Sequence, residues 1–103
     1  MYNAPAALLD AIQHYADAEY PVDDFLDIRK NGRELELLVR WDGFPESDDT
    51  WEPLRVMLKD MPAFTRQWFV SARMNPKYSH PHYTKLLTDA FRAFPQLQKG
   101  GVV

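Results

Sequence analysis

Apolar and polar residues alternate with a period of two in the middle of the chain, which predicts β-structure. The dipeptide Asn31-Gly32 favours a two-residue hairpin, because both central positions of such a turn need positive φ. Residues 34–41 are then the returning strand of the hairpin. One face of this strand is apolar and the other is mostly charged, since Leu35, Leu37, Val39 and Trp41 alternate with Glu34, Glu36, Leu38 and Arg40.

The same period predicts a first strand before the hairpin and a short third strand after it, within residues 20–53. The third strand is Thr50-Trp51-Glu52, which Pro53 ends. Asp42-Gly43 marks the turn between the second and third strands. In the first strand, Val22, Asp24, Leu26 and Ile28 are expected on one face, and Asp23, Phe25 and Asp27 on the other.

Apolar residues at helical spacing predict three helices, over residues 4–18, about 62–72 and about 82–94. Asp60 is the expected N-cap of the second helix, residues 75–81 form a linker, and residues 95–103 form a frayed tail. The stripes are Leu8, Leu9, Ile12, Tyr15 and Ala16; Met61, Phe64, Trp68 and Ala72; and Tyr83, Leu86, Leu87, Ala90, Phe91 and Phe94. The first and last stripes need a cover, so these helices are expected to pack on the rest of the chain, on each other or on a second copy.

Charge is distributed unevenly over the 103 residues, whose net charge is −3. Residues 19–60 hold twelve acidic and six basic residues, whereas the remainder holds three acidic and six basic ones. An acidic middle favours a basic ligand and makes nucleic acid an unlikely main partner. The chain has no cysteine, and no apolar run is long enough to span a membrane.

Three motifs resemble the chromodomain family, and they cover about half of the chain in the family's order. They are Glu19-Tyr20-Pro21-Val22, Val39-Arg40-Trp41-Asp42-Gly43-Phe44 and Asp48-Asp49-Thr50-Trp51-Glu52-Pro53. The resemblance implies an α+β fold, in which a C-terminal helix packs across a curved three-stranded antiparallel sheet. It also divides the chain into an N-terminal flanking helix (1–18), a chromodomain (19–73) and a C-terminal linker, helix and tail (74–103).

The resemblance further implies a binding site for a methylated histone tail, which such domains take up as an added strand. Tyr20, Trp41 and Phe44 match the family's aromatic cage around the methylammonium, and Asp48 matches the acidic position beside it. Glu19, Val22 and Glu52 are the further ligand-binding candidates.

Three of these residues also have a structural explanation, whereas Phe44 follows Gly43 in a turn, where a core residue is less expected. Trp41 shares a strand face with Leu35 and Val39, so a core position competes with the cage position. Tyr20 can simply hold the first helix against the sheet, and Asp48 lies in a polar loop. Trp51 is expected in the core.

Two departures from the family pattern affect the peptide groove. Pro21 has no N–H and removes one possible backbone hydrogen bond to a peptide. Residues 54–58 (LRVML) replace the polar position that histone readers have soon after W-E-P. This stretch is more similar to chromodomains at the tail of retrotransposon integrases, which gives an alternative function in targeting without methyl-lysine binding.

The sequence therefore predicts a nuclear, non-enzymatic module that binds methyl-lysine in chromatin. A chromo-shadow-like module that dimerises through the flanking helices and binds partner peptides is the other alternative. No cofactor is expected, and His80-Pro81-His82 is too sparse for a metal site. Nucleotide-loop and hydrolase motifs are absent from the sequence.

Overall fold

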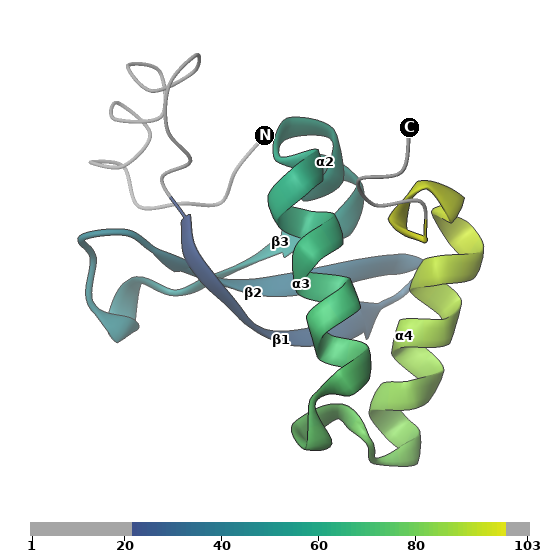
Figure 1. Ribbon diagram of the computed structural model, residues 1–103. Helices are drawn as coiled ribbons and strands as arrows, with labels where there is room; N and C mark the ends of the chain where they lie inside the picture. The colour runs from purple at the N-terminus through teal and green to yellow at the C-terminus, as the bar shows by residue number, and fades with distance from the viewer. Residues whose placement is uncertain (1–21, 99–103) are drawn as a thin grey trace.

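Three antiparallel strands in the order β1-β2-β3 form one curved sheet in the computed structural model, which describes residues 22–98 (Figure 1). The strands are β1 (Val22–Asn31), β2 (Glu34–Trp41) and β3 (Thr50–Pro53). Helices α2 (Leu54–Asp60), α3 (Pro62–Met74) and α4 (Pro81–Ala93) follow. There are also three short 3-10 helices in the described residues: η1 (Glu46–Asp48) between β2 and β3, η2 (Pro76–Tyr78) between α3 and α4, and η3 (Pro95–Leu97) after α4. The predicted α+β architecture is confirmed.

The predicted hairpin is confirmed in its strands and in the facing of β2, but its turn lies one residue later than expected. Asn31 pairs with Glu34 and has no positive φ, so the two turn residues are Gly32 and Arg33. Gly32 has φ of 63°, as its turn position requires. In β2 the buried and half-buried positions alternate strictly, so that Leu35, Leu37, Val39 and Trp41 point into the core.

The expected facing of β1 is wrong, because two bulges interrupt its alternation. The register against β2 shifts between Val22 and Asp24 and again between Phe25 and Asp27. Each bulge adds one residue to β1 and reverses the side chains that follow. The buried residues of β1 are therefore Val22, Phe25 and Ile28, three positions apart, instead of Val22, Leu26 and Ile28.

Side chains satisfy the backbone at these bulges. The carboxylates of Asp24 and Asp27 each accept a 2.8 Å hydrogen bond from the N–H of the following residue. Across the outer edge of β1, Trp68 Nε1 donates to the carbonyl of Phe25 at 2.8 Å, and Lys77 Nζ donates to the carbonyl of Leu26 at 2.8 Å. These contacts occupy carbonyl groups on which an added strand would depend.

Trp51 lies outside the core, contrary to expectation. It pairs with Leu38 on the face of the sheet that points away from the helices, and it is only half-buried. The guanidinium of Arg29 lies 4.2 Å from the centre of its ring, and Arg29 also forms a 2.7 Å ion pair with Glu36. A cation–π contact thus covers this tryptophan in place of a hydrophobic core.

Helix α2 was not predicted, and Asp60 is its last residue instead of the N-cap of the next helix. Leu54, Met57 and Leu58 occupy positions i, i+3 and i+4 of α2 and are buried. Met61, with φ of −136° and ψ of 63°, breaks the helical path, and α3 restarts at Pro62.

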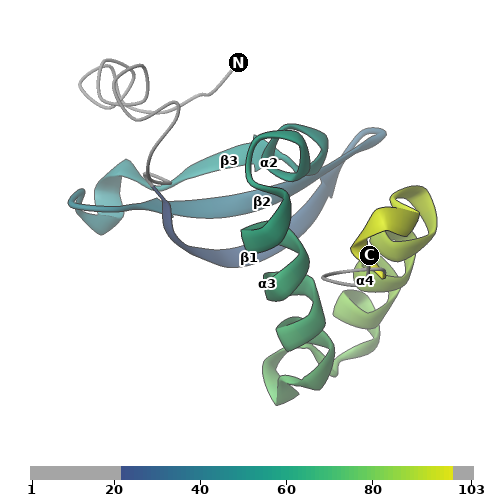
Figure 2. The ribbon, with the colours of Figure 1, turned by 45° about the horizontal axis from the view of Figure 1, so that its top comes forward.

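Helices α2 and α3 cover one face of the sheet, and α4 stands beside α3 (Figures 1 and 2). The Phe69 ring of α3 meets the Phe91 ring of α4 edge-to-face, with 5.8 Å between ring centres. Met61 and Ala72, at the ends of the expected α3 stripe, are buried as predicted, but its middle is shifted by one residue. Thr65, Phe69 and Ala72 are buried, whereas Phe64 and Trp68 are half-buried.

The predicted stripe of α4 packs on its own chain, which confirms this part of the flanking-helix expectation. Tyr83 and Phe94 are half-buried, and the four residues between them on the stripe are buried: Leu86, Leu87, Ala90 and Phe91. The predicted helix over residues 4–18 lies outside the described residues.

The linker and the tail are more ordered than expected. Tyr78 of η2 is buried, and its hydroxyl donates to the carbonyl of Leu26 at 3.2 Å. Leu97 of η3 has no exposed surface, so the chain packs as far as Gln98. Within residues 22–98, no helix has the length and apolarity to cross a bilayer, and no three His, Asp or Glu side chains are grouped as metal ligands.

Candidate functional site

Two of the three cage candidates lie on either side of the turn that follows β2. The N–H of Phe44 donates to the carbonyl of Trp41 at 3.1 Å, and Gly43 has φ of 82°, which favours glycine. Phe44 is half-buried and packs against the core, whereas Trp41 is 1% exposed. The turn therefore brings the backbones of two aromatic residues together at one end of the sheet.

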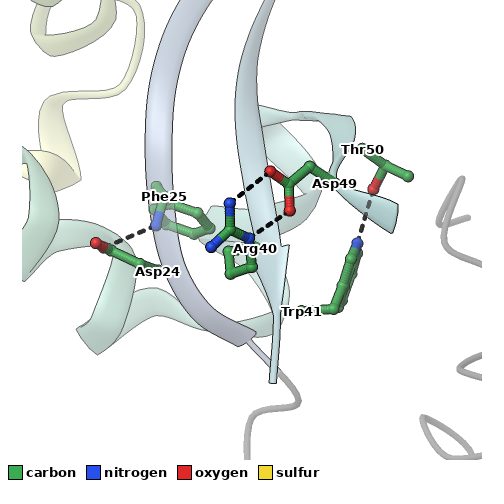
Figure 3. Close-up of polar contacts among 6 residues, drawn as sticks. All are labelled: Asp24, Phe25, Arg40, Trp41, Asp49 and Thr50. Atoms are coloured by element: carbon green, nitrogen blue, oxygen red, sulfur yellow. Dashed lines mark hydrogen bonds and ion pairs between the residues drawn. The ribbon is translucent and has the colours of Figure 1, made fainter. Parts of the chain in front are cut away.

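A chain of two hydrogen bonds holds the indole ring of Trp41. Its Nε1–H donates to the hydroxyl of Thr50 at 2.8 Å (Figure 3), and that hydroxyl donates to the Glu52 carboxylate at 2.8 Å. Thr50 and Glu52 are two residues apart on β3 and share a face, so one strand carries both. Glu52 has no exposed surface, so its carboxylate is held in a largely non-aqueous environment behind the tryptophan.

The loop between β2 and β3 is fixed by a two-point ion pair. Arg40 Nε and a terminal nitrogen of its guanidinium donate to the two carboxylate oxygens of Asp49, at 2.5 Å and 2.9 Å (Figure 3). The hydrogen bond to Asp49 is the main cause that raises the pKa of Arg40 above its ordinary value. This parallel geometry orients both planar groups, so it anchors the segment that carries η1.

The remaining predicted residues have different positions. Val22 pairs with Trp41 across β1 and β2, and its side chain is buried. Asp48 ends η1 and is half-buried, on the loop that the ion pair anchors. Tyr20 and Glu19 lie outside the described residues.

Thr50 is the residue that sequence reasoning missed. Its signal was present in the alternation of Thr50, Trp51 and Glu52, which puts the hydroxyl and the carboxylate on one face and the tryptophan on the other. That pattern also places Trp51 on the face of the sheet that points away from the core, as the structure shows.

Residues 20–70 match the family model described as the Chromo (CHRromatin Organisation MOdifier) domain. The chain belongs to the chromodomain family. The predicted resemblance is confirmed, and the matched region begins at the cage candidate Tyr20 and ends inside α3.

Curated relatives of this chromodomain are chromatin proteins by name. The chain is 53% identical to the Chromodomain Y-like protein of Rattus norvegicus over 38 residues. This aligned stretch covers 36% of this chain and 6% of the relative. The chain is 48% identical over 44 residues to the Chromobox protein homolog hpl-2 of Caenorhabditis elegans, which is 41% of this chain and 25% of the relative. For Heterochromatin protein 1 of Drosophila melanogaster the identity is 38% over 37 residues, which is 36% of this chain and 18% of the relative. The chain thus matches only a small part of each relative's length.

Proposed function

We propose that this chromodomain is a chromatin-binding module of the nucleus that recognises methylated lysine in a histone tail through Tyr20, Trp41 and Phe44. The observation that carries the proposal is the turn joining Trp41 to Phe44, with a buried carboxylate behind it. Val22 pairs with Trp41, and Tyr20 is two residues before Val22. Chain connectivity therefore keeps the Cα of Tyr20 within about 7 Å of that of Val22.

The chemistry of methyl-lysine fits this set of residues. Methylation keeps the positive charge of the ammonium but removes its hydrogen-bond donors and weakens its hydration. Aromatic faces attract such a cation, with each contact contributing about 0.5–2 kcal/mol. Glu52 and Asp48 add negative potential from the same end of the sheet without the need for a donor on the ligand.

Burial of Trp41 sets a condition on binding. The ring is 1% exposed, so a methylammonium reaches it only after neighbouring groups move apart. Part of the contact energy is then spent on this opening, which lowers the net affinity. An affinity in the micromolar range, about −8 kcal/mol, is the expectation for a short peptide.

The structure weakens one argument for the chromo-shadow-like alternative. A dimer through α4 would need its apolar stripe on the surface, but this stripe is covered by the same chain. The occupied outer edge of β1 does not separate the two functions, because an added histone strand and a partner peptide would both need a free strand edge. The covered stripe of α4 therefore supports a peptide reader over a module that dimerises through α4.

The experiment that tests the proposal compares substitutions at three aromatic residues. Tyr20→Ala and Phe44→Ala remove cage candidates, and Trp51→Ala removes an aromatic residue on the outer face of the sheet. Trp41→Ala is a poor choice, because loss of a buried tryptophan costs about 3–5 kcal/mol of stability. Binding is measured by calorimetry with methylated histone-tail peptides, and folding by circular dichroism.

We expect each cage variant to lose methyl-dependent binding by tenfold or more while it stays folded, and Trp51→Ala to bind within about threefold of the wild type. Equal losses in all three variants would count against an aromatic cage at this position.

A further inference from the structure

A pocket with a volume of about 610 Å³ lies among the end of α3, η2, α4 and η3. All of its lining residues come after residue 70, so it belongs to the C-terminal extension and lies outside the chromodomain match. The methyl-lysine site uses none of these residues. We call this surface the extension pocket and define it by Arg73, Leu87, Thr88, Phe91, Arg92 and Gln98.

Two arginines give the extension pocket a positive charge. The guanidinium of Arg73 lies 4.6 Å from the centre of the Phe91 ring, a cation–π contact that orients its flat donor fork. Arg92 comes from the last turn of α4. Both side chains are exposed, the lining contains no Asp or Glu, and neither arginine forms an ion pair with any carboxylate of residues 22–98.

The rest of the lining combines an apolar base with small polar groups. Leu87 and Phe91 are buried core residues that also border the pocket. Thr88 is exposed on the same helix, one position after Leu87. A ligand that fits has an anionic group for the arginine forks beside an apolar group for the base.

We propose that the extension pocket binds a short acidic peptide segment of a partner protein, with a carboxylate side chain next to an aliphatic one. A carboxylate accepts two parallel hydrogen bonds from a guanidinium, which matches the fork that Phe91 orients. Nucleic acid fits less well, because its backbone needs a row of cations, whereas this pocket has two arginines and the whole chain carries a net charge of −3. The site is independent of the methyl-lysine proposal.

The test is a titration of the ¹⁵N-labelled full chain, followed by NMR, with the acetylated and amidated peptide Gly-Asp-Leu-Glu-Leu-Gly. The matched peptide Gly-Asn-Leu-Gln-Leu-Gly keeps the shape and removes the charge. Neither peptide contains lysine, so the result is separate from methyl-lysine recognition. We expect saturable shifts of the Thr88, Phe91 and Gln98 amides, with a Kd on the order of 0.1–1 mM for so short a peptide.

Exposed residues allow variants that leave the fold intact. Arg73→Gln combined with Arg92→Gln should weaken binding at least tenfold, and Arg73→Lys should weaken it less, because charge remains but the stacked fork is lost. The control is Lys85→Gln, which removes an exposed cation of α4 outside the pocket and should change the Kd by less than twofold.

Three results would overturn the proposal. The first is an absence of shifts at the pocket amides with the acidic peptide, and the second is equal binding of the charged and neutral peptides. The third is tighter binding of a 12-base-pair DNA duplex than of the acidic peptide, with shifts at the same amides. That result would indicate nucleic acid, instead of a peptide, as the ligand.

Discussion

The indole N–H of Trp41 donates its hydrogen bond to the hydroxyl of Thr50, 2.8 Å away on the neighbouring loop-to-strand boundary. The Thr50 hydroxyl in turn donates a hydrogen bond to the buried carboxylate of Glu52. The orientation of Trp41, which we propose as a cage residue, thus depends on a residue that would not itself touch a ligand. Thr50 is a positioning residue in this account.

Replacement of Thr50 by Val tests this arrangement, because it keeps the branched shape and removes the hydroxyl. Trp41 Nε1–H loses this acceptor and Glu52 loses this donor, at an expected cost of about 1–3 kcal/mol in the free energy of unfolding. Urea denaturation measures the cost. Thr88→Val, on the exposed side of α4, is the matched control and should stay within about 0.5 kcal/mol. A loss for Thr50→Val as small as that of the control would mean that the hydrogen bonds do not hold the site.

The attachment of α4 to β1 predicts a loss of stability at alkaline pH. The hydroxyl of Tyr83 donates to Asp27 at 2.8 Å, which is the main cause that raises the pKa of Tyr83 to about 12. Burial of Tyr78, together with the negative charge of Asp27, raises the pKa of Tyr78 to about 12 as well. An unfolded tyrosine loses its proton near pH 10, so the unfolded chain releases protons first and stability falls between about pH 10 and 12.

Denaturation at a series of pH values measures this effect, with Tyr83→Phe as the comparison. Below pH 10 the contribution of the tyrosine hydroxyls is fully present, and the wild type should be the more stable of the two by about 1 kcal/mol. The difference should shrink as the pH approaches 12. A stability difference that stays constant from pH 8 to pH 12 would contradict the proposed link between α4 and Asp27.

The sequence predicted the hairpin and the Trp41-to-Phe44 turn because their signals are local. Gly32 and Gly43 supply the positive φ of the two turns, and β2 alternates without interruption. The first turn nevertheless consists of Gly32 and Arg33, one residue later than Asn31-Gly32. The facing of β1 was not predictable by a strict period of two, because the bulges depend on backbone contacts with Asp24 and Asp27. The available signal was the spacing of the apolar residues 22, 25 and 28, with an aspartate directly before 25 and another directly before 28.

Tertiary packing decided the other differences. Asp60 before Pro62 has the local pattern of an N-cap, but Leu54, Met57 and Leu58 gain burial by forming α2 first. Leu97 lies two residues after Pro95 in a segment without helical spacing, and only its packing against the neighbouring helices explains why it is fully buried. The resemblance to chromodomains favours a core position for Trp51, whereas its place in the alternation with Glu52 indicates the outer face.

Removal of the C-terminal extension should destabilise the chromodomain. Residues 75–98 contribute five buried apolar side chains besides Tyr78, so we propose that they form one folding unit with the family-matched region. A chain of residues 1–74 should lose more than about 2 kcal/mol of unfolding free energy relative to a chain of residues 1–98. Equal stability of the two would make the extension a separate unit. The five side chains are Leu86, Leu87, Ala90, Phe91 and Leu97.

The most direct measurement for the account is a calorimetric titration of the wild-type chain with pairs of histone-tail peptides, identical except for methylation of one lysine. The pair that binds is then repeated with a neutral isostere, in which a carbon atom replaces the methylated nitrogen. Recognition by a cage of Tyr20, Trp41 and Phe44 predicts micromolar binding of the methylated peptide, at least tenfold tighter than that of the unmethylated peptide and clearly tighter than that of the isostere. Equal affinity for the methylated and unmethylated peptides throughout the panel, or no binding of any methylated peptide, would contradict the methyl-lysine function.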